Sequence, residues 1–184
     1  MDDMKKSSRG RHFEMRVERR LLANFPECMI LHDVIIPGRK GKPTQIDFVL
    51  LDETGIYVIE AKGYSGTVTG NASDVFWTKT YMRNDGSKDE RLVMNPLVQN
   101  SGHVRYIEKL INDPSVPVHS IAVLSEKCDS SGISHSKSDS FMFHLKDFTT
   151  GIRGIMDVSE AKVTDSKLEE IERHLESSQS FQGN

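Results

Sequence analysis

One stretch decides the fold of this chain: residues 45–62, which read QIDFVLLDETGIYVIEAK. Its first part, Gln45 to Leu51, and its second part, Ile56 to Lys62, are both rich in residues that favour β-strands. The four residues between them, Asp52 to Gly55, have the composition of a turn. The stretch therefore predicts a β-hairpin.

The register of this hairpin brings three charged residues together. A loop of four residues pairs Leu51 with Ile56, which sets Asp47 directly opposite Glu60. Lys62 then lies two residues beyond Glu60 on the same face. A loop of two residues would oppose Asp47 to Lys62 and keep all three on one face, whereas an odd number of loop residues would separate them. Either even-numbered loop predicts a cluster of two acids and a lysine.

The surroundings of this cluster are apolar. Neighbouring positions in both strands are hydrophobic on both faces, as expected for a strand pair that is covered on both sides. Directly opposed side chains lie about 4.5–5.5 Å apart at Cβ, and like charges so placed destabilise a sheet. Asp47 and Glu60 therefore repel each other unless one is protonated, a lysine lies between them, or a cation bridges them.

A bound divalent cation is one of these solutions. Mg²⁺ prefers carboxylate, carbonyl and water oxygens, so Asp47, Glu60 and the backbone carbonyl of Ala61 could bind it and leave positions for water and phosphate. The ion would lower the pKa of its water and offset the charge that develops on phosphate oxygens. Lys62 would orient or help to deprotonate that water, or pair with the phosphate. A surface ion pair between Lys62 and either acid is the alternative interpretation.

Composition limits the function classes. The chain has 184 residues, a length typical of one domain with a single core. Its 24 basic and 27 acidic residues give a net charge of −3, which excludes a polycation that holds nucleic acid by bulk attraction. Basic residues do cluster locally, in the first twenty residues and at Arg39, Lys40 and Lys42. These could contact phosphates, and a solvent-exposed charged face is the alternative.

The cysteine content and the hydropathy indicate the compartment. Cys28 and Cys128 have no paired spacing, which argues against a disulfide scaffold or a thiolate metal site. No apolar run has the length of an export signal or of a membrane span. We therefore expect a cytoplasmic protein without membrane contact.

The rest of the chain predicts an α/β fold. Helical spacing occurs at 11–24, from Asn95-Pro96 to before Pro114, at 145–155 and around 168–175, and strand patterns occur at 30–36, 75–82, 116–124 and 141–143. Residues 83–91 are predicted to form a charged loop, and residues 129–140 a mobile surface loop. This order predicts a mixed β-sheet flanked by helices on both faces. We expect a flexible N-terminus over 1–10, the main domain over 11–163, and a C-terminal helix and polar tail over 164–184.

Two predicted helices carry further polar candidates. Glu14 lies beside the apolar stripe of the first helix and could supply a third carboxylate, or be an ordinary solvated glutamate. Gln99, His103 and Tyr106 share one side of the helix after Pro96, turned away from Leu97. They could hydrogen-bond a water or a phosphate, and a polar helix face without a ligand is the alternative.

Several short segments together resemble the nuclease-related domain (NERD) family, a branch of the PD-(D/E)xK, or restriction-endonuclease-like, superfamily. They occur in the family's order within residues 10–124: QID at 45–47, GIYVIEAKGYSG at 55–66, Trp77, NPLVQN at 95–100, and His103. This chain departs from the family at Phe13, where glycine usually precedes the helix glutamate. The superfamily's Pro-Asp lead-in is Ile46-Asp47 here.

The resemblance implies a restriction-endonuclease-like fold with a nuclease-like active site. In that site Asp47 and Glu60 bind the metal, and Lys62 assists the nucleophile. Glu14 completes the acidic set, and Gln99 has an orienting role from its helix. The implied cofactor is Mg²⁺ or Mn²⁺.

The implied reaction is hydrolysis of DNA phosphodiester bonds by a metal-activated water. Arg39, Lys40, Lys42 and His103 are the candidates for contact with the nucleic acid. The alternative function is a non-catalytic module with a nuclease fold that binds nucleic acid or recruits a partner. A homodimer or a larger assembly is compatible with both functions.

Overall fold

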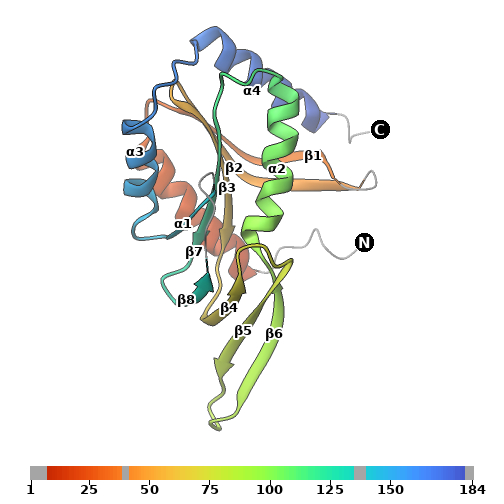
Figure 1. Cartoon of the computed structure of the whole chain (residues 1–184), viewed down its shortest axis with the longest axis vertical. Coiled ribbons are helices and arrows are strands. Elements are labelled where there is room, and N and C mark those ends of the chain that lie inside the picture. The colour runs from red at the N-terminus through yellow and green to blue at the C-terminus, as the bar shows by residue number, and fades with distance from the viewer. Residues whose placement is uncertain (1–7, 39–41, 135–139, 181–184) are drawn as a thin grey trace.

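The computed structural model describes residues 8–38, 42–134 and 140–180. Within these ranges the chain forms a mixed α/β fold with a five-stranded and a four-stranded sheet (Figure 1). The helices are α1 (Ser8–Asn24), α2 (Pro96–Ile111), α3 (Phe148–Asp157) and α4 (Asp165–Ser180). The strands are β1 (Met29–Pro37), β2 (Pro43–Asp52), β3 (Gly55–Lys62), β4 (Gly66–Asn71), β5 (Phe76–Met82), β6 (Lys88–Met94), β7 (Val118–Leu124), β8 (Cys128–Ser134) and β9 (Ser140–His144). No helix in the described ranges has the length and apolarity needed to span a membrane.

The five-stranded sheet has the order β1-β2-β3-β7-β9. β1, β2 and β3 are antiparallel neighbours, whereas β3, β7 and β9 run parallel. Leu51 pairs with Ile56, which confirms the register predicted for the central hairpin. Asp52 also pairs with Gly55, so the ladder continues to a turn at residues 53–54 without changing that register.

Both faces of this sheet are covered by helices, as the sequence predicts. Even positions of β2 and odd positions of β3, such as Phe48, Leu50, Tyr57 and Ile59, pack in one core cluster with residues of α1 and α3. The opposite positions pack in a second cluster with residues of α2 and α4. Figure 1 shows the two helix pairs on opposite sides of the sheet. This double cover explains why the hairpin is almost continuously hydrophobic.

The alternation of faces breaks in β2 at the position of Asp47. Ile46 packs in the same cluster as Val49, whereas strict alternation would place it with Phe48. The neighbouring strand is irregular at the same level, because Asp33 has a φ of 54°, in the left-handed region. The ladder between β2 and β3 ends with the pair Phe48 and Ile59, one step before Asp47. Asp47 thus lies where the two strands stop pairing.

The four-stranded sheet has the order β6-β5-β4-β8 and continues the central strands. Three residues separate β3 from β4, which begins at Gly66, and three residues separate β7 from β8, which begins at Cys128. β3 and β7 are parallel, and so are β4 and β8. One parallel strand pair is therefore interrupted at the carboxyl ends of β3 and β7 and resumes in the second sheet.

Two predicted loops are strands of this second sheet. The prediction of a charged loop over 83–91 is wrong from Lys88 onward, because β6 pairs with β5 along its whole length. The prediction of a mobile loop over 129–140 is wrong up to Ser134, because β8 pairs with β4, and residues 135–139 lie outside the described ranges. β4 was not predicted at all. These segments are rich in charged residues, serine or glycine, and backbone pairing rather than burial on two faces makes them strands.

The other predicted elements are found close to their expected places. Asn95 caps α2, with its side chain accepting a hydrogen bond from Leu97 N, and Pro96 is the first helical residue. α3 begins at Phe148, later than predicted, because Leu145 N donates to Leu124 O and continues the contact between β9 and β7. α4 contributes Leu168, Ile171 and Leu175 to the second core cluster.

Candidate active site

Three predicted site residues meet where the parallel strand pair is interrupted. Glu60 and Lys62 lie at the carboxyl end of β3, and Asp47 lies beside them in β2. Glu60 is 1% exposed and Asp47 is 4% exposed, so both carboxyl groups are buried. Lys62 Nζ lies 2.6 Å from Glu60 Oε1. The structure therefore brings together the two acids and the lysine that the hairpin register predicts.

The Asp47 side chain accepts a backbone hydrogen bond from β3 at the point where the ladder between β2 and β3 ends. Its Oδ2 atom accepts a hydrogen bond of 2.8 Å from the amide of Ala61. The carboxylate also acts electrostatically on Lys62 and on His103. The irregular backbone at Asp47 thus directs this acid toward the end of β3, where Glu60 and Lys62 lie.

Lys62 is held in its charged form. Burial alone would lower the pKa of Lys62, but the Glu60 carboxylate in contact with it outweighs that effect and raises the pKa above its ordinary value. Tyr64, two residues further, has its pKa raised to about 12 by burial, partly opposed by the charge of Lys62. Lys62 therefore carries a positive charge and serves as a hydrogen-bond donor beside the two acids.

His103 is buried beside Glu60 on α2. Its Nδ1 atom lies 3.6 Å from Glu60 Oε2, and its Nε2 atom lies 3.3 Å from Thr44 Oγ1. Burial lowers the pKa of His103 to about 4, so the imidazole is neutral near pH 7. The prediction that His103 lies on a polar helix side turned away from Leu97 is wrong, since both residues belong to the buried face of α2. Direct contact of His103 with nucleic acid stays a prediction.

The acids and the lysine leave this site with a net negative charge. Asp47 and Glu60 carry two negative charges, Lys62 carries one positive charge, and His103 is neutral, so these four side chains sum to −1. A net charge held in a buried site is costly, and a cation close to both carboxylates would offset it. Within the described ranges no three His, Cys, Asp or Glu side chains form a group that could hold a metal. A site with two carboxylates suits Mg²⁺ or Mn²⁺ better than a zinc ion that takes all its ligands from the protein. The reason is that Mg²⁺ keeps several water ligands.

The remaining predicted site residues lie on elements next to this cluster. α1 passes close to the end of β3. The closeness is seen at Gly63, where an added Cβ atom would lie only 3.0 Å from Phe13 Cβ. Glu14 follows Phe13 in α1 and is half-buried, and Gln99 is half-buried in the first turns of α2. The catalytic roles of Glu14 and Gln99, and ligation by the Ala61 carbonyl, stay predictions.

The basic loop before β2 is described only at one end. Lys42 is exposed next to the start of β2. Arg39 and Lys40 lie outside the described ranges. Their contact with nucleic acid therefore stays a prediction.

Two buried asparagines of α2 position the site, and the sequence did not single them out for this role. Asn100 Nδ2 donates to Val58 O at 2.7 Å and to Ser120 Oγ at 3.1 Å, which ties α2 to β3 and β7. Asn95 Nδ2 donates to Asp74 O at 2.7 Å, which ties the start of α2 to the second sheet. The signal was present in the segment NPLVQN, but an asparagine that caps a helix and one that bridges strands look alike in a sequence.

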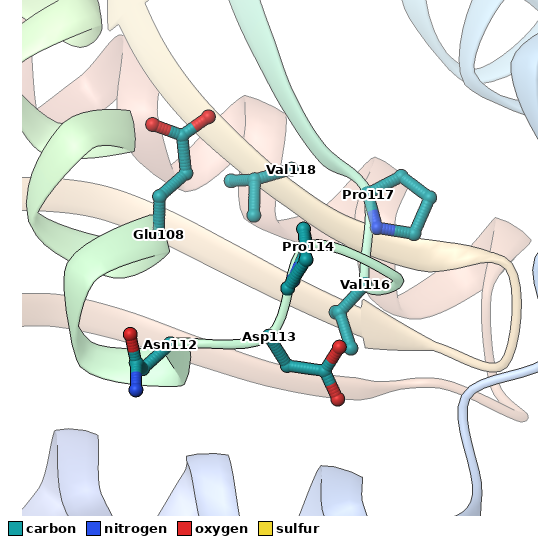
Figure 2. A pocket seen from close by; sticks show the side chains of 7 residues that line it. All are labelled: Glu108, Asn112, Asp113, Pro114, Val116, Pro117 and Val118. Atoms are coloured by element: carbon teal, nitrogen blue, oxygen red, sulfur yellow. The ribbon is translucent and has the colours of Figure 1, made fainter.

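A pocket elsewhere in the molecule is separate from this cluster. It has a volume of about 440 Å³ and lies between the end of α2 and the start of β7 (Figure 2). Figure 2 shows Glu108, Asp113 and two prolines, Pro114 and Pro117, around it. Since β7 begins there and the acids lie near the carboxyl end of β3, which runs parallel to β7, the pocket and the cluster are at opposite ends of the strands.

Comparison with known proteins agrees with the resemblance seen in the sequence. The model of the nuclease-related domain family matches residues 9–125, a range that contains Asp47, Glu60, Lys62 and His103. An uncharacterized protein of Bacillus anthracis is 29% identical over 164 residues, which are 89% of this chain and 73% of that protein. The matched family range ends one residue after β7, so it includes the strand interruption but not β8, β9, α3 or α4.

Proposed function

Because the chain belongs to the nuclease-related domain family, we propose that it is a Mg²⁺- or Mn²⁺-dependent nuclease that hydrolyses DNA phosphodiester bonds. The family supports nuclease-related chemistry in general. The observation that carries the finer proposal is the meeting of two buried acids and a charged lysine at one end of β3. Paired carboxylates with an adjacent cationic side chain suit hydrolysis of a negatively charged ester.

In this proposal the chain itself supplies binding, orientation and charge. Asp47 and Glu60 would hold the ion together with the carbonyl of Ala61. When bound, the ion supplies an acidified water and stabilises negative charge on the phosphate. Lys62 is held charged by Glu60 and would donate a hydrogen bond to a phosphate oxygen or to the attacking water.

The buried neighbours keep these groups in place. His103 is neutral and lies against Glu60, so it restricts the carboxylate without adding a competing positive charge. Asn100 fixes α2 against β3 and β7. Glu14 and Gln99 complete the proposed set from α1 and α2. A cytoplasmic location goes with this proposal, since Cys28 and Cys128 both have free thiols.

The test is a cleavage panel with purified protein. Single-stranded, duplex and branched DNA, together with RNA, are incubated with and without Mn²⁺ or Mg²⁺. We expect metal-dependent cleavage of DNA that falls by about a hundredfold or more in Lys62→Ala, because a transition-state charge contact is lost. Lys109→Ala, on the exposed side of α2, is the matched control and should cleave like the original chain.

Two outcomes would count against the proposal. If no substrate is cut while nucleic acid is still bound, the chain is a non-catalytic binding module. If cleavage needs no metal, or survives in Lys62→Ala, the assigned cluster is not the catalytic site.

A further inference from the structure

The hairpin of β5 and β6, residues 76–94, extends away from the five-stranded sheet (Figure 1). We call it the arm. Its pairing register divides its side chains between two faces. On one face the opposed pairs are Trp77 with Val93, Lys79 with Arg91, and Tyr81 with Asp89. On the other face Thr78 opposes Leu92 and Met82 opposes Lys88.

The first of these faces begins in the core of the molecule. Trp77 is fully buried and packs in a cluster with Leu97, Ala122 and Leu124, and Val93 packs against the same cluster. The face therefore lies toward the five-stranded sheet at its base. Further along the arm the same face carries Lys79, Tyr81, Arg91 and Asp89 in place of apolar side chains. We call it the inner face.

Cations and aromatic rings alternate along the inner face. Lys79 Nζ lies 5.8 Å from the ring centroid of Tyr64 and 5.6 Å from that of Tyr81. The Arg91 guanidinium lies 5.6 Å from the Tyr81 ring. Three of the four cation–π contacts in the described ranges thus form one row, which limits the freedom of two cations before any ligand binds.

Asp89 joins a third cation to this row. Its carboxylate accepts hydrogen bonds from Tyr81 Oη, from Arg83 at 2.9 Å and from Arg91 at 3.1 Å. Both arginine side chains remain more than half exposed. Lys79, Arg83 and Arg91 against Asp89 give this group of side chains a net charge of +2, in a chain whose net charge is −3.

The row begins at the candidate active site. Tyr64 follows Lys62 by two residues, and its ring makes the first cation–π contact of the row, with Lys79. Its hydroxyl donates a hydrogen bond of 2.8 Å to Met94 O at the base of the arm. Tyr64, two residues after Lys62, therefore links the end of β3 to the base of the arm and to its first cation.

We propose that the inner face of the arm binds the phosphodiester backbone of the nucleic-acid strand that leads away from the candidate active site. This inference rests on the proposed nuclease function, because it places the substrate's cut phosphate at Asp47, Glu60 and Lys62. Arginine forks suit phosphate oxygens, and cations already restrained by rings and by Asp89 lose less entropy on binding. The charge of +2 on Lys79, Arg83, Arg91 and Asp89 together would let this part of the chain bind a polyanion, although the net charge of the whole chain is negative.

The outer face of the arm provides a contrast. This face, opposite the inner one, exposes Met82 and Leu92, at 61% and 72%. Its two charged residues, Lys88 and Glu90, have opposite charges that cancel. The same hairpin therefore has one face suited to phosphates and one that is not. This asymmetry supplies a matched control within the same hairpin.

The test measures binding without cleavage. Fluorescence anisotropy of a labelled single-stranded DNA is recorded in EDTA, over a series of salt concentrations, for the original chain, Lys79→Ala/Arg91→Ala and Lys88→Ala. We expect the double variant to bind at least about tenfold more weakly. The slope of log affinity against log salt should also fall by about 1.4, for two lost contacts with a single strand. Lys88→Ala should bind like the original chain.

Further variants separate binding from folding. Lys79→Arg/Arg91→Lys keeps both charges, so it should bind more tightly than the double alanine variant and keep the salt slope of the original chain, while the changed side-chain geometry allows some loss of affinity. An RNA of the same sequence should show the same loss in the double alanine variant, because the contacts are to phosphates. Unchanged affinity in that variant, or an equal loss in Lys88→Ala, would overturn the inference.

The two proposals fail in different ways. If no substrate is cleaved but the alanine double variant loses binding, the arm still binds phosphates and the nuclease function is rejected. If the original chain cleaves DNA and the double variant binds and cleaves with unchanged KM, the nuclease function is retained and the role of the arm is rejected.

Discussion

Each of the two sheets of this protein contains two parallel strands that continue into the other sheet, but the strands differ in cover and in composition. β3 and β7 are covered on both faces by helices, whereas β4 and β8, which follow them after three residues each, belong to a sheet whose arm extends beyond the core. The first pair is made mostly of apolar residues, whereas the second is rich in threonine, serine and glycine. The two-sided apolar cover of the first sheet holds its backbone in place, whereas the second depends more on strand pairing and on one anchoring cluster.

The site lies where these two kinds of structure meet. Inside the five-stranded sheet a carboxylate would lack polar partners. On the exposed arm it would be solvated, and water and salt would screen its charge. At the interruption Glu60 is enclosed by the core yet reached by Lys62, and Asp47 gains the Ala61 amide. The difference between the sheets therefore explains why charge can be concentrated at this place.

The strongest test of the comparison removes the anchor of the second sheet. Trp77 is fully buried, and its indole N–H donates to Asn71 O at 2.9 Å. We expect Trp77→Ala to lower the free energy of unfolding by about 3–5 kcal/mol, because it leaves a large cavity. Thermal unfolding would show a fall in Tm of about 10 °C. The adjacent Phe76 is half exposed, and Phe76→Ala should change stability by less than about 1 kcal/mol.

A second test loosens the link between α2 and the parallel strands. Asn100 is fully buried and donates to Val58 O and Ser120 Oγ. Asn100→Ala should cost about 2 kcal/mol, because it deprives buried polar groups of a partner. Chemical denaturation measures this, with Ser101→Ala, whose hydroxyl contacts only its own helix, as control. A smaller effect for Asn100→Ala than for the control would show that α2 is held by apolar contacts alone.

A third test relieves the charge crowding at the interruption. Asp47→Asn can keep an oxygen acceptor for the Ala61 amide while removing one negative charge. In EDTA we expect this variant to be more stable than the original chain by about 1 kcal/mol, since functional charge clusters commonly cost stability. Added Mn²⁺ should raise the Tm of the original chain and leave that of the variant unchanged.

The control for this test is Asp157→Asn, at the exposed end of α3. It should retain the Mn²⁺-dependent rise in Tm and show little change in EDTA. If Mn²⁺ stabilises Asp47→Asn as much as the original chain, the cation does not bind at Asp47.

The smallest expected effect concerns pH and the arm. Hydrogen bonds from Tyr81 and Arg83 hold the pKa of Asp89 well below its ordinary value of 3.8. The ionised form is thus favoured by folding, so its stabilising effect is present above that value and is lost as the pH falls below it. Asp89→Asn should lower the Tm by about 1 °C at neutral pH, and this difference from the original chain should shrink as the pH falls below about 4. A difference that grows on acidification would contradict this assignment.

Prediction succeeded where one segment's sequence contains its own structural cause. Asn95-Pro96 begins α2 because a capping side chain and a fixed φ act within a few residues. The register of β2 and β3 was predicted correctly because the turn signal at 52–55 centres the hairpin, although the turn itself has two residues, 53–54, and not four. Prediction failed for β6 and β8, whose charged and serine-rich sequences become strands only by pairing with β5 and β4. The prediction for His103 failed for a related reason, because its polar neighbours, Thr44 and Glu60, come from strands far away in the sequence.

The sequence by itself determined the central hairpin, the meeting of Asp47, Glu60 and Lys62, and the family, because these depend on local periodicity and on the order of short motifs. Only the tertiary structure decided the charge state of Lys62, the burial of His103, the bridging role of Asn100 and the cationic face of the arm. Each of these depends on groups that are distant in the chain and on the water excluded between them. Such neighbours exist only once the strands have paired and the helices have covered them.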